Sequence, residues 1–152
     1  IEWADTIRYL GIYLRRHNVF MCCLDNHKRS FYRSFNAIYG KIGRVASEEV
    51  IIQLVQSKCV PVMLYCLEAC PLKKSQLQSL ENVIVNCFMK IFHTRSKETV
   101  NDCIEMFNLN VRKLLDRRRV TFLKTFATRN DRNTACCAFK ARCMADLHCI
   151  IV

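Results

Sequence analysis

The chain has 152 residues, of which 51% are apolar and 24% are charged, a composition typical of one globular domain. Three glycines and two prolines are too few for the many turns of a β-sandwich or barrel, so we expect a mainly α fold. Lys and Arg outnumber Asp and Glu by 24 to 13, and a net charge of +11 attracts polyanions: nucleic acid, an acidic membrane or an acidic protein surface.

Eleven cysteines would suit a small secreted disulfide scaffold, yet the chain carries no signal peptide. We therefore expect reduced thiols, most of them buried in apolar helical runs as Cys59, Cys66 and Cys87 are. The start at Ile1 and the apolar end at Val152 predict a fragment of a longer protein. We expect it to be intracellular, in the nucleus or cytoplasm, without a membrane span because no apolar run reaches about eighteen residues.

Residues 7–14, IRYLGIYL, are rich in β-branched and aromatic side chains on both faces, which predicts an N-terminal β-strand or hairpin. A lone hairpin is marginal in water, so we expect this strand to complete a sheet whose other strands lie outside the chain. Gly11 permits a bulge or a close backbone approach.

Residues 20–44 have the clearest amphipathic pattern in the chain. Phe31, Phe35 and Ile38 share one face, and the opposite face carries Arg29, Arg33, Lys41 and Arg44. Such a basic stripe is either a solvated surface or a row of cations that follows a phosphate backbone. The second interpretation gains from the absence of acidic residues that could pair with the stripe.

Residues 47–70 predict a central helix, with Ser47 as N-cap and Glu48 and Glu49 in the first turn. Pro61 should kink it, because proline removes one backbone donor. Its apolar residues cover about half the helix circumference: Val50, Ile51, Leu54, Val55, Val62 and Tyr65.

Three further helices are expected, at 77–92, 96–107 and 110–128, which makes a bundle of four to five helices. Ser75 and Gln78 predict a capping box for the first, which should pack antiparallel to the central helix. In the last helix Arg112, Arg118 and Arg119 fall within the apolar arc, so either an acidic group docks there or the helix is exposed with ragged patterning.

No arrangement typical of catalysis is evident: there is no nucleophile with a base, no Gly-rich phosphate loop and no paired carboxylates. The tail offers zinc-ligand types, but without the usual spacing: Cys136, Cys137, Cys143, His148 and Cys149. We therefore predict no enzyme activity and no metal or cofactor for this chain.

Three segments in this order resemble the C-terminal part of a non-long-terminal-repeat (LINE-like) retrotransposon reverse transcriptase. They are Tyr9-Leu10-Gly11-Ile12, the basic helix end Lys41-Ile42-Gly43-Arg44, and Val60-Pro61-Val62-Met63-Leu64-Tyr65 with Glu68 and the helix that follows. The resemblance implies an end-of-palm strand region at 1–16 and a helical thumb at 17–93. Additional basic helices would occupy 94–130 and a Cys-rich tail 131–152.

A thumb of this kind would bind the RNA/DNA template-primer duplex through phosphates, beside the fingers and palm of the same polyprotein. The expected contacts are Arg29, Arg33, Lys41, Arg44, Lys58, Lys73 and Lys74. The family's metal-binding aspartates are absent here, so Mg²⁺ is expected only in the full-length polymerase. Alternatives are a basic helical module that binds an acidic protein, a zinc-dependent nucleic-acid module, and a non-functional remnant of a degenerate element.

Overall fold

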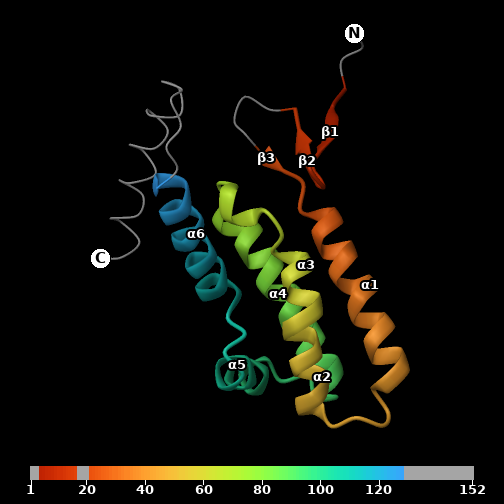
Figure 1. Cartoon of the computed structure of the whole chain (residues 1–152). Helices are drawn as coiled ribbons and strands as arrows, with labels where there is room; N and C mark the ends of the chain where they lie inside the picture. Colours follow the sequence, from red (N-terminus) through yellow and green to blue (C-terminus); the bar gives the residue numbers. More distant parts are fainter. Residues whose placement is uncertain (1–3, 17–20, 129–152) are drawn as a thin grey trace.

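A computed structural model describes residues 4–16 and 21–128, and Figure 1 shows a small sheet at one end of a group of helices. The strands are β1 (Thr6–Tyr9), β2 (Ile12–Arg15) and β3 (Met21–Cys22). The helices are α1 (Asp25–Ile42), α2 (Glu48–Leu54), α3 (Val60–Met63), α4 (Lys74–Ile91), α5 (Lys97–Met106) and α6 (Val111–Thr128). The predicted mainly α fold, with an N-terminal hairpin and a helical bundle, is confirmed.

Of the two alternatives predicted for residues 7–14, a strand or a hairpin, the structure has the hairpin. Strands β1 and β2 pair antiparallel with Tyr9 opposite Ile12, and the backbone reverses at Leu10 (φ 45°) and Gly11 (φ 85°). Positive φ at both central residues is the condition of a type I′ turn, which suits the twist of a hairpin. Strand β3 pairs with β2, so a third strand of the sheet belongs to this chain, although we expected the other strands to lie outside it. The apolar pattern of this segment implies that both faces of the strand pack against other parts of the protein, but all four residues of β1 are exposed.

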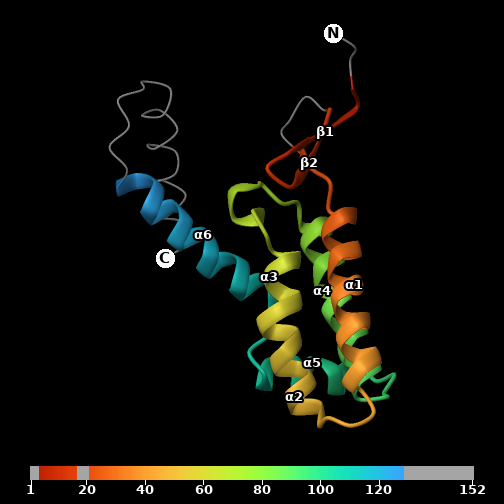
Figure 2. The same cartoon turned by 45° about the vertical axis from the view of Figure 1, so that its right-hand side comes forward.

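Helix α1 is buried along the face that the sequence predicted. Phe31 and Phe35 are fully or almost fully buried, with exposed fractions of 0% and 2%, and belong to one apolar cluster with Ile52, Met63 and Phe88. The cluster thus joins α1 to the central helix and to α4. Figure 2 shows these three stretches standing alongside one another, whereas α6 runs away at an angle.

The central helix begins after Ser47, as predicted, but ends at Met63 instead of residue 70. A π-helical turn over Val55–Cys59 separates α2 from α3, and the Val60 N–H donates to the Val55 carbonyl five residues earlier. In a regular helix the ring of Pro61 would clash with the carbonyl four residues before it, and Pro61 has no N–H to donate. In the π turn the hydrogen bond spans five residues instead of four, so the backbone before Pro61 differs from that of a regular helix.

One extra residue in the turn rotates the side chains that follow, so the predicted apolar arc is wrong beyond Val55, and it is also wrong at Val50, which is 45% exposed. Val62 and Tyr65 are 41% and 52% exposed, whereas Cys59, Val60 and Met63 are buried. The helix therefore presents Val62 and Tyr65 to solvent, close to the hairpin.

The remaining helices match their predicted ranges closely. Helix α4 runs antiparallel to the α2–α3 stretch (Figure 1). Its capping box was predicted two residues too late, at Ser75 and Gln78. In the structure the Lys73 N–H donates to Gln76 Oε1 at 2.9 Å. Ser96 caps α5 by accepting the Thr99 N–H at 3.3 Å. None of the helices in the described part of the chain combines the length and apolarity needed to cross a membrane.

The expectation of reduced thiols is wrong for one pair, since Cys22 and Cys70 form a disulfide across 48 residues of sequence. The bond links β3 to the segment between α3 and α4. Such pairing depends on which segments meet in space, which cysteine spacing alone does not determine. Cysteine is a free thiol at five other described positions: Cys23, Cys59, Cys66, Cys87 and Cys103.

Two glycines make a matched pair for testing the hairpin turn. Gly11→Ala places a Cβ at positive φ and 3.4 Å from the Tyr65 ring, so it should lower the free energy of unfolding by about 1 kcal/mol. Gly40→Ala adds a methyl group to α1 with nothing within 4 Å, and should raise that free energy by about 0.5–1 kcal/mol. Urea titrations measure both, and equal effects of the two substitutions would contradict the turn.

The buried thiols should be chemically inert in the folded protein. Burial raises the pKa of Cys59 to about 11, and burial followed by the nearby Cys59 raises that of Cys87. At pH 8 a thiol of pKa 11 holds about a hundredfold less thiolate than one with the ordinary value of 9.0. Iodoacetamide should therefore modify the half-buried thiols of Cys23, Cys66 and Cys103 before those of Cys59 and Cys87, as peptide mapping would measure. Rapid modification of Cys59 or Cys87 without unfolding would contradict this core.

Candidate nucleic-acid interface

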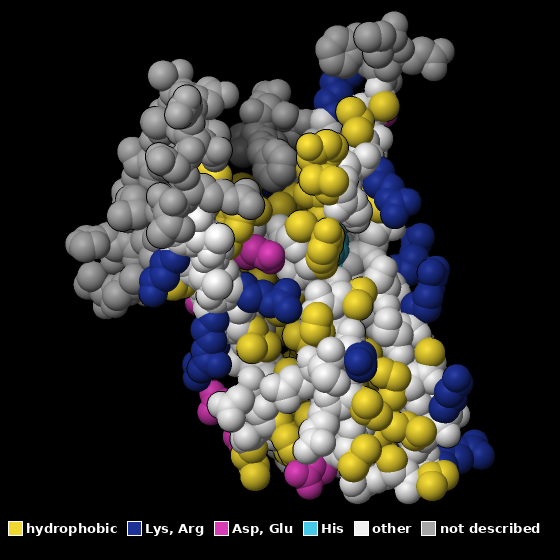
Figure 3. Space-filling model, viewed as in Figure 1, with side chains coloured by type: hydrophobic (Ala, Val, Ile, Leu, Met, Phe, Trp, Pro, Cys, Tyr) yellow, Lys and Arg dark blue, Asp and Glu magenta, His cyan; other side chains and the backbone are white. Residues whose placement is uncertain are grey.

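The exposed face of α1 carries the basic residues that the sequence singled out. Arg29, Arg33 and Lys41 are exposed, and Arg44 is exposed in the turn that follows the helix. In Figure 3, Lys and Arg side chains succeed one another down the edge of the molecule along which α1 runs in Figure 1. Because Phe31 and Phe35 hold the opposite face in the core, the direction of this basic face is set by packing.

The length of this face suits a regular polyanion. Arg29 and Lys41 are separated by roughly 18 Å along the helix axis, at 1.5 Å per residue. That distance spans about five steps of a duplex with its 3.4 Å rise per strand. Side chains on one rigid helix face can therefore meet successive phosphates without reading bases.

The hairpin end of the basic face borders a cleft of about 810 Å³ between the sheet, α1 and α3. The hairpin contributes Arg8, Gly11 and Tyr13, and the helical part contributes Arg29, Arg33 and Tyr65. The remaining lining residues are Asn26, His27, Ser30, Pro61 and Val62.

Two tyrosines give the cleft an aromatic component. The guanidinium of Arg8 lies 5.9 Å from the ring centre of Tyr13, its partner across the hairpin. The Tyr65 side chain is 52% exposed. The neighbouring Cys66 side chain, and to a lesser extent Glu68, raise the pKa of Tyr65, which favours a neutral phenol. Aromatic faces beside cations are suited to stacking on bases or sugars next to a held backbone.

Acidic side chains are absent among the residues described as lining this cleft. The sole acid of α1, Asp25, borders a different cleft of about 210 Å³ together with Lys28. Their charged groups lie 3.3 Å apart, and hydrogen bonds from Lys28 and then Cys23 lower the pKa of Asp25. The positive charge of Arg8, Arg29 and Arg33 is therefore not offset within the larger cleft.

Helix α6, the other basic helix, lies close to acids of the chain itself. Arg112 pairs with Glu81 of α4 at 3.2 Å, and this ion pair supplies the acidic group expected for Arg112 in the apolar arc. Arg117 and Arg118 line a cleft with Glu68, one of whose carboxylate oxygens is buried without a hydrogen-bond partner. Part of the charge of α6 is thus balanced inside the molecule.

The other predicted contacts are exposed but dispersed. Lys58 lies on the π-helical turn, outside the residues that line the cleft. Lys73 and Lys74 stand at the start of α4, whose first turn borders the smaller cleft with Arg15 and Lys28. The structure therefore brings together only Arg29 and Arg33 of the predicted set at one cleft, and Lys41 and Arg44 extend their face.

Several cleft residues were not identified from the sequence. Arg8 and Tyr13 became neighbours only because residues 6–15 form a hairpin, and Tyr65 was assigned to a buried arc. A turn at Leu10–Gly11 was the one signal that could have paired Arg8 with Tyr13. The proposed zinc ligands of the tail lie outside the described residues. Within those residues no group of three or more His, Cys, Asp or Glu side chains is suited to a metal ion.

Comparisons of the chain with protein-family models, with curated proteins and with solved structures find no match.

Proposed function

We propose that this chain binds a nucleic-acid duplex through the sugar-phosphate backbone, as the thumb-like part of a LINE-like reverse transcriptase would bind its RNA/DNA template-primer. The observation that carries the proposal is the acid-free cleft where Arg8, Arg29 and Arg33 meet two tyrosines, continued by Lys41 and Arg44. Rigid cations on one helix face favour phosphate contacts over base recognition.

The charge distribution favours this surface over α6. The cations of α1 face solvent opposite the aromatic core, whereas Arg112 of α6 is already paired with Glu81. Phosphates that approach Arg29, Arg33, Lys41 and Arg44 displace counterions without breaking any ion pair described for these four residues, so the full electrostatic gain remains available.

The proposed role is binding without catalysis. The metal-binding aspartates of the resembled polymerases are not among these residues, and no nucleophile or paired carboxylates take their place. Nucleotide transfer and Mg²⁺ would belong to the fingers and palm of the same polyprotein, which we propose as the partner of this part. We propose an intracellular location, in the nucleus or cytoplasm, on the same basis.

The proposal predicts strongly salt-dependent binding to a short RNA/DNA hybrid. Five phosphate contacts, from Arg8, Arg29, Arg33, Lys41 and Arg44, give a slope of about −4.5 in log affinity against log salt, or roughly a five-hundredfold loss from 50 to 200 mM salt. Arg33→Glu with Arg44→Glu removes two contacts, so affinity should fall roughly tenfold or more and the slope should flatten by about 2. Fluorescence anisotropy with a labelled hybrid measures both quantities.

The control for this double substitution has the same net charge. Lys97→Glu with Lys113→Glu changes two exposed lysines on α5 and α6, and should leave the affinity within about twofold of the original. Equal losses from both double variants would indicate attraction by net charge alone. Binding that ignores salt, or that heparin fails to compete, would favour the acidic-protein alternative.

A further inference from the structure

We propose that the Cys22–Cys70 disulfide is a redox switch that sets the geometry of the cleft: the oxidised form holds the hairpin against the helices, and reduction releases it. This inference rests on the proposed function, because duplex binding is the output of the switch.

The disulfide is the one covalent cross-link between the sheet and the bundle among the described residues. Strand β1 is exposed throughout, Ile12, Tyr13 and Leu14 of β2 are partly buried, and the Cys23 N–H donates to the Tyr13 carbonyl at 2.8 Å. Of the strand residues whose burial is described, Cys22 alone is buried, with 5% exposure, and its partner Cys70 is 4% exposed. With β1 exposed and β2 only partly buried, the sheet owes part of its fixed position to the covalent bond.

The cleft is shared between the two parts that this bond connects. Arg8 and Tyr13 belong to the hairpin, while Arg29, Arg33 and Tyr65 belong to the helical part. The hairpin turn comes close to the helical part at Tyr65, whose ring lies 3.4 Å from a Cβ placed on Gly11. Movement of the hairpin would therefore separate one set of cations from the other.

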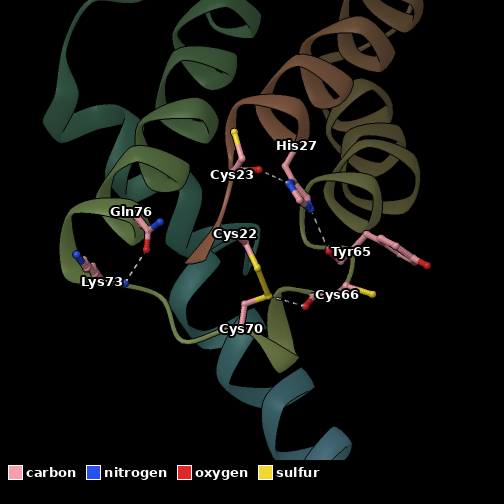
Figure 4. The surroundings of a disulfide bond; sticks show 8 residues. All are labelled: Cys22, Cys23, His27, Tyr65, Cys66, Cys70, Lys73 and Gln76. Carbon is pink, nitrogen blue, oxygen red and sulfur yellow. Dashed lines mark hydrogen bonds between the residues drawn. A yellow bond between two sulfur atoms is a disulfide. The ribbon is translucent and has the colours of Figure 1, made fainter. Parts of the chain in front are cut away.

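The helices have attachments of their own near the same point. His27 is buried, and its ring nitrogens lie 3.3 Å from the Cys23 carbonyl and 3.2 Å from the Tyr65 carbonyl (Figure 4). Leu24 is buried in the main core. These contacts join the start of α1 to the end of α3 without involving the disulfide, so reduction should leave the bundle in place, while β1 and the hairpin turn gain freedom about the Cys23–Tyr13 hydrogen bond.

Both cysteines are buried, but Cys22 lines the cleft of about 210 Å³ with Cys23 and Lys28, and a reductant would approach the disulfide from this cleft. In Figure 4 the side chains of Cys23 and Cys66 point away from the disulfide, so neither thiol is aimed at it for internal exchange. A dithiol reductant would supply the two electrons: its thiolate attacks one sulfur, forming a mixed disulfide, and its second thiol completes the exchange. The products are the Cys22 and Cys70 thiols and the oxidised reductant.

Thermodynamic linkage gives the switch a second signature. If oxidation raises the affinity for duplex by some factor, bound duplex must favour the disulfide over the dithiol by the same factor. Reducing half of the Cys22–Cys70 bonds in a sample should therefore take a higher dithiol concentration when the protein is saturated with duplex.

The test compares oxidised and dithiothreitol-reduced protein in two assays, hybrid affinity and hydrogen exchange of backbone amides. Reduction should lower affinity on the order of tenfold, because the hairpin contacts are displaced. Amide exchange should accelerate in β1 and β2 while α1 and α4 keep their protection. Cys22→Ser with Cys70→Ser should behave like reduced protein in both redox states. Cys23→Ser with Cys66→Ser keeps the disulfide and should respond to dithiothreitol as the original does.

The outcomes separate the two proposals. Equal affinity and equal hairpin exchange in both redox states would overturn the switch and leave duplex binding intact. Absence of a Cys22–Cys70 linked peptide after oxidation, or loss of protection in α1 and α4 on reduction, would also overturn it. Oxidised protein that releases its hairpin on reduction but binds no hybrid would instead contradict the proposed function.

Discussion

The packing of Phe31 and Phe35 against the central helix and α4 determines how the rest of the surface is arranged. Both rings are buried, and exposing either would cost about 3–5 kcal/mol by analogy with truncation of buried aromatic residues. Helix α1 therefore cannot rotate about its axis without losing much of the stability of a domain this small. The arginines on its opposite face are consequently held outward at fixed spacing, which is what distinguishes them from flexible surface charges.

Pro61 affects the composition of the cleft through the π-helical turn that precedes it. The π-helical turn over Val55–Cys59 shifts the side chains that follow, so that Met63 enters the core and Tyr65 faces the hairpin. The sequence pattern, which assumes a regular helix, placed Tyr65 in the buried arc, whereas the structure brings it to the cleft. The local backbone adjustment at a proline thus connects the core of the bundle to the composition of the candidate site.

Helical periodicity was sufficient to locate α1, α4, α5 and α6, because each carries an apolar arc. Helix α1 nevertheless begins at Asp25 and not at residue 20, because residues 21–22 form β3. The sequence left a strand and a hairpin open for residues 7–14, because Leu10 precedes Gly11, whereas the familiar turn signal is Asn or Asp before Gly. Arg29 and Arg33 could be nominated from their helix face alone. Arg8, Tyr13 and the partner of Cys22 could not, since each depends on contacts between segments that periodicity does not relate.

The central claim is that phosphates meet the basic face of α1 in preference to α6, and arginine protection measures this most directly. The protein is treated with an arginine-selective dicarbonyl reagent, with and without a saturating RNA/DNA hybrid, and each site is quantified by mass spectrometry. Our account predicts protection of Arg29 and Arg33 by the hybrid, with Arg117 of α6 modified equally in both samples. Protection of Arg117 while Arg29 and Arg33 remain fully reactive would contradict it.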